Sequence, residues 1–191
     1  MRIGDSYKGG RTVKKTIHKF FSVWEYDKEE LWLNEMSAKG LLFQSVGFCT
    51  YTFEEGEPGK YIYRLELLNP RLNREEKAQY IRFVEDTGAE HIASLFRWVY
   101  FRKEDDGSGF EIFSDLASRI AHTNRMLSLL GIITGVNFIN GLNMLRMWYT
   151  NSDYSLTTPL IIFVCCAITG YGFFRINQKK QKLVKEKTLR E

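Results

Sequence analysis

The chain is poor in cysteine and proline, with three of each among 191 residues. Cys49 stands alone, whereas Cys165 and Cys166 are adjacent inside an apolar stretch. This arrangement predicts no disulfide framework of the kind that supports small secreted domains. The first residues, Met1–Lys19, also lack the apolar core of a secretory signal peptide. We therefore expect the N-terminal part of the chain to remain on the side of the membrane where it is made.

Sequence motifs for catalysis and cofactor binding are missing as well. There is no Gly-rich phosphate-binding loop, no nucleophile elbow and no Cys-x-x-Cys pair. The histidines, His18, His91 and His122, are scattered and have no cysteine or carboxylate at ligand spacing, which argues against a metal site. The sequence thus supports no enzymatic activity and predicts no cofactor. An enzyme that acts on a lipid-like substrate would need a pocket that only a structure reveals.

Two long stretches contain no charged residue. Met126–Leu145 is about as long as the ~20 apolar residues that an α-helix needs to cross a bilayer. Leu156–Phe174 is a second uncharged stretch, and residues 146–155 form a short connection between the two. The pattern predicts a transmembrane hairpin: helix 1 at 126–145, an external loop at 146–155 and helix 2 at 156–174. A juxtamembrane helix is expected at 111–125, with its continuity into the first span left open.

The basic residues around this hairpin predict its orientation. Arg119 and Arg125 precede the first span, and a basic tail, 175–191, follows the second. By the positive-inside rule both termini are cytoplasmic, in a multi-pass protein of a bacterial cell membrane. Charge next to a span favours the lipid bilayer as the partner, and we expect no direct nucleic-acid binding. A solvated helical tail is the alternative interpretation of those lysines.

The part of the chain before the hairpin has the pattern of one small α+β domain. A flexible arm is expected at 1–16 and a cytoplasmic α+β domain at 17–110. Asp27 with Glu30, and Asn73 with Glu76, have the spacing of helix capping boxes. The expected order is strand 18–24, helix 27–40, strands 46–53 and 60–67, helix 73–87 and strand 92–103. That order, βαββαβ, predicts a ferredoxin-like sheet covered by two helices on one face.

The last expected strand carries aromatic residues on both faces. Phe96, Trp98 and Tyr100 alternate along it and lie on one face, and Leu95, Val99 and Phe101 lie on the other. An aromatic face left over after the helices have packed is unusual if it meets only water. The three residues therefore form a candidate face for a protein partner. Packing within the chain and contact with a second copy, giving a homo-oligomer, are the alternatives.

Polar side chains inside the two uncharged stretches form a second candidate site. Asparagine is costly in hydrocarbon unless its amide is paired. On a helical wheel Thr134, Asn137 and Asn140 cluster on one side of the first span, and Cys166 and Thr169 lie on one side of the second. These five residues form a candidate intramembrane polar seam. The seam either holds the two helices together or receives a partner, a second copy or a small ligand.

Several motifs resemble a known bacterial family. They are WEYDKEELWLNEMSAKG, YTFEEGEPGKYIYRLEL, FVEDTGAEHI, WVYFRK and EIFSD, in this order over roughly residues 18–125. Together they are similar to the family called domain of unknown function 2812. The resemblance implies a cytoplasmic domain followed by hydrophobic helices, in proteins often encoded beside PadR-type transcriptional regulators. Ala89 departs from the family pattern, where tryptophan is common. The family has no established activity, so the resemblance implies no mechanism.

Two functional hypotheses follow. The first is a membrane-anchored regulatory or sensory protein whose cytoplasmic domain binds a protein partner, with a PadR-type regulator as the candidate. The second is an accessory or immunity subunit that acts within the membrane on a transporter or a membrane-active peptide. In the regulatory hypothesis the aromatic face around Trp98 would bind the partner. In the accessory-subunit hypothesis Asn137 and Asn140 would do so.

Overall fold

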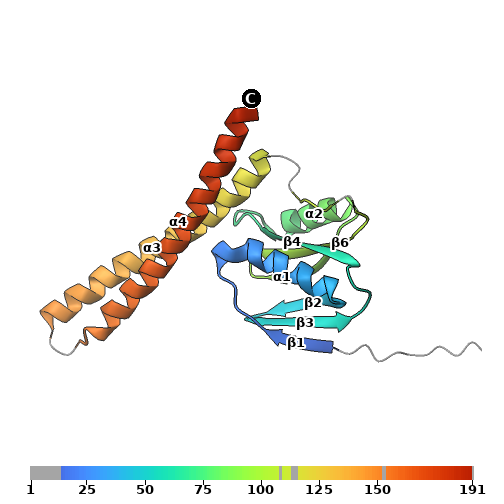
Figure 1. The fold of residues 1–191 in the computed structure, drawn as a ribbon. Helices are drawn as coiled ribbons and strands as arrows, with labels where there is room; N and C mark the ends of the chain where they lie inside the picture. Colours follow the sequence, from blue (N-terminus) through green and yellow to red (C-terminus); the bar gives the residue numbers. More distant parts are fainter. Residues whose placement is uncertain (1–13, 108, 113–115, 152–153, 191) are drawn as a thin grey trace, which may run out of the picture.

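The computed structural model describes residues 14–107, 109–112, 116–151 and 154–190. It shows an α+β domain followed by two long apolar helices, α3 and α4 (Figure 1). The domain lies beside one half of this helix pair, and the other half extends away from it (Figure 1). Most of the arm expected at 1–16 is outside the described residues, and its last three residues begin the first strand.

The domain contains two antiparallel sheets of three strands each. The first has the order β1-β3-β2 and the second the order β4-β6-β5. Strands β1 (Lys14–His18), β2 (Leu41–Gly47) and β3 (Thr50–Glu55) form the first sheet. The second sheet consists of β4 (Tyr61–Leu67), β5 (Glu90–Leu95) and β6 (Trp98–Glu104). The helical elements of the domain are η1 (Val23–Glu25), α1 (Tyr26–Ala38) and α2 (Arg74–Glu85).

The α+β class is confirmed, but the ferredoxin-like topology is not, because two expected strands are hairpins. The expected strand 46–53 turns at Phe48–Cys49, and the strand 92–103 turns at Phe96–Arg97. Cys49 and Phe96 have φ angles of 55°, which tight two-residue turns require and which Asn or Gly usually supplies. Neither turn contains Asn or Gly, so no local turn signal marks either reversal.

Helix starts and stops were predicted with mixed success. The capping box of α2 is confirmed, since Asn73 accepts from the Glu76 N–H and Glu76 accepts from the Asn73 N–H. The box expected at Asp27 and Glu30 is wrong, because α1 begins at Tyr26 and has no side-chain cap. The strand expected at 18–24 is also wrong: β1 ends at His18, and the following residues lead into η1.

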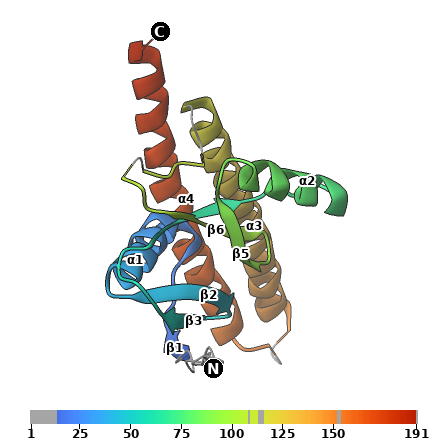
Figure 2. The same ribbon diagram turned by 90° about the vertical axis from the view of Figure 1, so that its right-hand side faces the viewer.

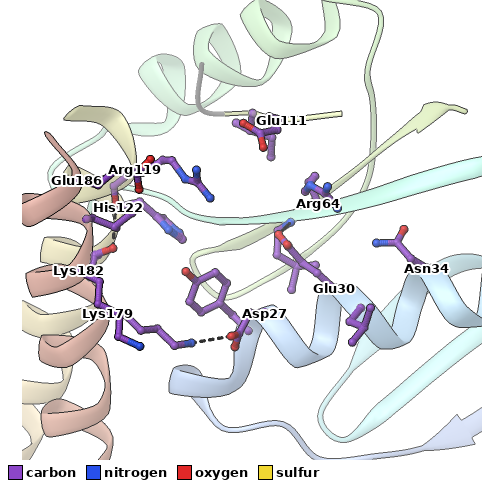
Figure 3. Close-up of a pocket in the computed structure, with 16 residues that line it drawn as sticks. Asp27, Glu30, Asn34, Arg64, Glu111, Arg119, His122, Lys179, Lys182 and Glu186 are labelled. Carbon is purple, nitrogen blue, oxygen red and sulfur yellow. Dashed lines mark hydrogen bonds and ion pairs between the residues drawn. The ribbon is translucent and has the colours of Figure 1, made fainter. Parts of the chain in front are cut away.

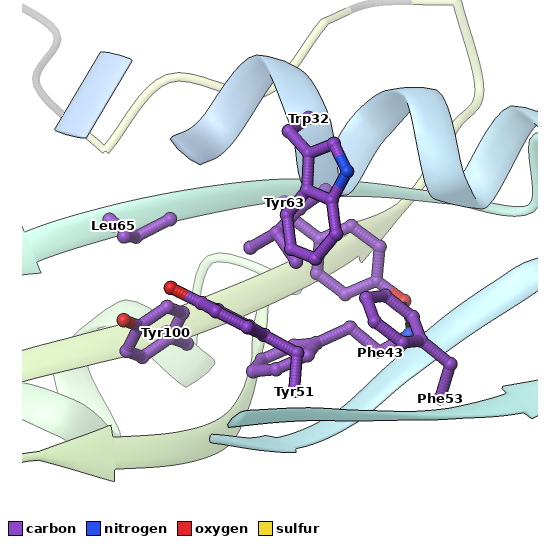
Figure 4. Close-up of a cluster of buried hydrophobic side chains, with 8 residues drawn as sticks. Trp32, Phe43, Tyr51, Phe53, Tyr63, Leu65 and Tyr100 are labelled. Atoms are coloured by element: carbon purple, nitrogen blue, oxygen red, sulfur yellow. Dashed lines mark hydrogen bonds between the residues drawn. The ribbon is translucent and has the colours of Figure 1, made fainter. Parts of the chain in front are cut away.

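An aromatic core lies between α1 and the two sheets. Trp32 of α1 lies above rings contributed by strands of both sheets (Figure 4). These rings meet mainly edge-on or tilted, with the centroids of Trp32 and Tyr51 4.9 Å apart. Truncation of one such buried ring to alanine costs about 3–5 kcal/mol. The buried members of the core are Trp32, Leu33, Phe43, Tyr51, Phe53, Tyr63, Leu65 and Tyr100.

Side chains of α1 satisfy the free edge of β4. Because β4 is an edge strand, every second N–H group points away from its sheet. Residues spaced one turn apart on α1 accept these groups, and so fix the helix along the strand. The bonds are Tyr61 N–H to Ser37 Oγ (3.4 Å), Tyr63 N–H to Asn34 Oδ1 (2.7 Å) and Leu65 N–H to Glu30 Oε1 (2.7 Å).

The long helices have the properties expected of membrane spans. Helices α3 (Leu116–Thr150) and α4 (Thr157–Arg190) pack side by side (Figure 2) and are long and apolar enough to cross a bilayer. Length and composition alone are weak evidence of membrane insertion. The region expected as a juxtamembrane helix is continuous with the first span from Leu116 onward. Helix α4 likewise continues without a break through the basic tail.

Candidate functional site

A large cavity lies where the domain meets the helix pair. Its volume is about 670 Å³, within the ~300–1,000 Å³ typical of small-molecule sites. The domain contributes α1 and β4 to its wall, and the helix pair contributes the first turns of α3 and the last turns of α4 (Figure 3). The polar lining residues are Tyr26, Asp27, Glu30, Asn34, Arg64, Glu111, Arg119, His122, Thr123, Lys179, Lys182 and Glu186, and the apolar ones are Leu31, Leu65, Ile112 and Leu183.

Charges of both signs line this junction cavity in equal number. The acidic residues are Asp27, Glu30, Glu111 and Glu186, and the basic residues are Arg64, Arg119, Lys179 and Lys182. A site with both signs and apolar side chains between them suits a ligand that carries opposite charges on a partly apolar body. Sequence analysis missed the site because its residues come from positions more than 150 apart in the chain.

Glu30 is the most perturbed carboxyl group of the junction cavity. Burial raises its pKa to about 7, although the Leu65 N–H that it accepts favours the charged form. A group with this pKa changes its charge near neutral pH. Glu30 can therefore respond to protons, or to a cation placed beside it, without any large movement of α1.

Two polar contacts join the helices to the edge of β4. His122 of α3 accepts the Leu67 N–H through Nε2 at 3.0 Å, which continues the row of bonds from α1. Arg125 pairs with Glu66 at 2.7 Å, and the Tyr80 hydroxyl donates to the same carboxyl group. Burial is the main influence on Glu66 and raises its pKa, while both partners oppose the rise. These contacts hold α3 against the second sheet.

On the domain side, helix α4 contacts the start of α1 and η1. Lys179 lies 2.9 Å from the Asp27 carboxylate, donates to the Trp24 carbonyl at 3.3 Å and sits over the Tyr26 ring. A Cβ atom at Gly172 would overlap the Trp24 indole, so glycine is required for this close approach. Lys179 of the basic tail is thus engaged by the domain.

An apolar cluster completes the docking between domain and helices. Leu67, Met126, Leu130 and Ile176 are nearly or fully buried there, together with Leu127. Trp98 packs against them from the domain side. The junction cavity therefore lies next to a packed interface between the domain and the helix pair.

Comparison with protein families identifies the chain. Residues 25–135 match the family model described as protein of unknown function, DUF2812. The chain belongs to the DUF2812 family. The match includes most of the domain and the part of α3 that docks on it. No curated protein and no solved structure matches the chain.

The structure does not place the candidate partner residues of this DUF2812 chain on one exposed face. Tyr100 is 2% exposed and belongs to the aromatic core. Trp98 is partly buried and stacks on Tyr26 with ring centroids 6.1 Å apart. Phe96 alone is open, at 89% exposed, because it lies in the turn between β5 and β6. The three aromatic residues were expected on a common face because residues 92–103 were predicted to form one strand, whereas they form two strands joined by a turn.

Tyr100 instead takes part in a buried polar cluster. Its hydroxyl and that of Tyr51 each donate to Oε1 of Glu29 at 2.7 Å. Burial raises the pKa of Glu29, and both hydrogen bonds oppose the rise. Because these groups satisfy one another inside the core, we assign them a structural role. Among the described residues, no three His, Cys, Asp or Glu side chains are grouped to hold a metal ion.

The intramembrane seam is assembled only in part. The Thr134 hydroxyl donates to that of Thr169 at 3.0 Å, and the Cys166 thiol lies 3.6 Å from the Thr134 carbonyl oxygen. Asn137 is half-buried and Asn140 exposed, and neither amide has a hydrogen-bond partner among the residues that the structure describes. The seam thus joins α3 to α4 through the threonines and leaves the asparagine amides available.

Proposed function

We propose that this chain is a membrane-anchored regulatory or sensory protein whose cytoplasmic domain binds a protein partner. The observation that carries the proposal is the junction cavity, whose walls come from the domain on one side and from α3 and α4 on the other. A ligand that contacts both walls stabilises the docked arrangement by its binding free energy. Docking of the domain would then report on the ligand or on the state of the membrane helices.

The proposed orientation places the junction cavity at the cytoplasmic surface of a bacterial cell membrane. Arg119, Lys179 and Lys182 line it, and basic residues beside a span favour the cytoplasmic side. The ligand class that fits is a small amphiphile carrying both charges, since acidic and basic side chains alternate with leucine and isoleucine. A PadR-type transcriptional regulator is the partner class that the family resemblance suggests.

Crosslinking in native membranes, followed by gentle purification and mass spectrometry, tests this function. The wild type is expected to retain a small amphiphile and a cytoplasmic regulator. Lys182→Glu reverses one charge in the cavity wall and should release the amphiphile, whereas Lys185→Glu makes the same change outside that wall. Recovery of the same molecules with both variants would show that the junction cavity does not bind the amphiphile.

A second function is favoured by the free asparagine amides. An accessory or immunity subunit would use Asn137 and Asn140 to bind a transporter or a membrane-active peptide inside the bilayer, where an unpaired amide is costly. Replacement of both by leucine should then abolish recovery of an integral membrane partner. Under the regulatory proposal the same variant keeps its cytoplasmic partner, so the experiment separates the two functions.

A further inference from the structure

Three phenylalanines project from one edge of the domain. Phe20, Phe48 and Phe96 are 67%, 79% and 89% exposed. They come from three separate connections, which precede η1, join β2 to β3 and join β5 to β6. All three border the same hollow of about 200 Å³, so the fold gathers them at one place. Large apolar side chains that converge while remaining exposed mark an interaction surface.

The backbone geometry of the two turns does not favour phenylalanine at these positions. Phe96 itself has a φ of 55°, a conformation in which bulky residues are strained and glycine is preferred. Its neighbour Arg97 turns back and donates to the Leu68 carbonyl, which fixes the turn and leaves Phe96 pointing outward. Strain at an exposed apolar residue indicates a role outside the folding of the domain.

The position of this edge along the helix pair identifies what it faces. Lys182 and Glu186 of α4 lie level with Glu30 and Asn34 of α1, far from the apolar ends of the helices. Nearer those ends, Trp24 meets Gly172, and Val23 and Trp98 meet the Met126–Leu130 segment.

The phenylalanine edge continues this series in the same direction. Phe20 lies three residues before Val23 in the sequence, and Phe96 lies two residues before Trp98. The hollow that the three phenylalanines border is also lined by Val23 and Trp98, so the edge lies directly beside the docked Met126–Leu130 segment, next to the uncovered half of the helices. That half begins at Ile132, whose side chain is exposed, as are most of the apolar side chains that follow.

Charge on the same edge fits a phospholipid surface. Lys19 precedes Phe20, is exposed and lines the same hollow as the three phenylalanines. Lysine near an anionic leaflet is favourable, and aromatic rings partition to the boundary between headgroups and acyl chains. Apolar tips flanked by lysine thus match a bilayer better than they match the apolar surface of another protein.

We propose that Phe20, Phe48 and Phe96 enter the headgroup region of the bilayer and orient the domain on the membrane. This inference rests on the proposed membrane anchoring of α3 and α4. The domain would then be held by two attachments, docking on the helices and insertion of the three loop tips. Its orientation relative to the membrane becomes fixed, which presents α2 and the outer sheet edges to the cytoplasm.

Spin labels on the full-length chain in phosphatidylcholine–phosphatidylglycerol vesicles test the proposal. In a background where Cys49, Cys165 and Cys166 are replaced by alanine, labels are placed through Phe48→Cys and Phe96→Cys. Phe83→Cys on α2 is the matched control, since Phe83 is 66% exposed on another element, and Ile139→Cys reports on the span. Collisions with oxygen, which concentrates in the bilayer, are compared with collisions with a water-soluble nickel chelate.

The labels at 48 and 96 should show an oxygen-to-nickel collision ratio several-fold higher than the label at 83. A ratio equal to that at 83, with the label at 139 in the bilayer, overturns this inference and leaves the anchoring intact. Labels at 48 and 96 shielded from both reagents would place a protein there and would also overturn it. A label at 139 that is open to nickel overturns the anchoring and this inference together.

Discussion

The two halves of the α3–α4 pair differ in both composition and surroundings, since the charged residues of the pair are concentrated at the domain end. At the domain end, Met126, Leu130 and Ile176 are buried against the domain. At the other end, Ile132, Ile139 and many others remain exposed, and only 17% of the most apolar window of each helix is buried. Water disfavours so much uncovered apolar surface, whereas hydrocarbon accepts it. One half of the pair thus holds the domain, and the other half has the length and the uncovered apolar surface of a membrane span.

The polar residues of the two halves differ in the same way. At the domain end Arg125 and His122 bond to specific groups of β4. At the far end the Thr134 hydroxyl donates to Thr169, which itself donates within α4, and Asn140 has no hydrogen-bond partner among the described residues. The docking of the domain on the helices is therefore specified by directional hydrogen bonds and an ion pair. The exposed half of the helix pair makes fewer such contacts and is characterised by its apolar composition. Variants at matched positions can test this division.

The largest effect is expected when Arg125 is replaced by methionine. The Glu66 side chain is only 2% exposed, so its charge would lose its cationic partner inside the interface. Removal of one member of a buried pair costs about 3 kcal/mol. Urea unfolding of the domain, followed by tryptophan fluorescence in detergent micelles, measures this loss. The double variant Arg125→Met/Glu66→Gln should recover most of it; equal losses in both would argue against the ion pair.

Substitution of Gly172 by alanine should loosen the docking by about 2 kcal/mol. The new methyl group would displace Trp24, and overpacking of this kind costs about 1–3 kcal/mol. Zero-length crosslinking between Lys179 and Asp27, whose charged atoms lie 2.9 Å apart, reports the docked population. Gly135→Ala is the control, because a Cβ there meets nothing within 4 Å. Unchanged crosslinking in Gly172→Ala would show that Trp24 does not set the interface.

Glu30→Gln should change how the stability of the domain depends on pH. The folded-state pKa of Glu30, about 7, is above its value in the unfolded chain, so the folded domain takes up a proton more readily. This contribution to stability is complete below about pH 4.5 and is lost as the pH rises through 7, by an amount on the order of 2 kcal/mol.

The difference between the two pH curves isolates this group from the other buried residues. Glu29 and Glu66 also have raised pKa values, and protonation of His122 would break its bond to Leu67, so the wild-type curve sums several effects. The gap between wild type and Glu30→Gln should widen between pH 4.5 and 7 in unfolding titrations. Parallel curves over that range would show that Glu30 ionises as it does in water.

The smallest effect is expected within the exposed half. Thr134→Val keeps the shape of the side chain but removes the hydroxyl that donates to Thr169. Hydrogen bonds between membrane helices contribute about 0.6 kcal/mol on average, so the helix pair should loosen only slightly. Steric trapping of α3 and α4 in bicelles can resolve this change. Thr134→Ser, which retains the hydroxyl, should behave as the wild type; a loss above that of Gly172→Ala would reverse the proposed ranking.

Local sequence signals predicted the elements whose determinants are close in the chain. The alternation over Tyr61–Leu67 gave β4 within one residue, and Asn73 with Glu76 gave the start of α2. Gly40, with a φ of 77°, follows the end of α1 as expected. The absence of charge over 126–145 and 156–174 located the cores of α3 and α4. Each of these features depends on backbone sterics, capping or transfer free energy within a few neighbouring residues.

Tertiary structure alone decided what the remaining polar and aromatic residues do. Phe48–Cys49 and Phe96–Arg97 form turns because the pairing of β2 with β3 and of β5 with β6 outweighs their poor turn propensity. In the sequence Glu30 resembles a helix-capping residue, but in the structure its carboxyl group accepts the Leu65 N–H at the free edge of β4. By itself the sequence determined the approximate positions of the helices, the strand β4 and an apolar hairpin, since these are local. The two sheets, the partly buried Trp98, the buried Tyr100 and the junction cavity depend on contacts between segments that are distant in the sequence, and no local pattern predicts such contacts.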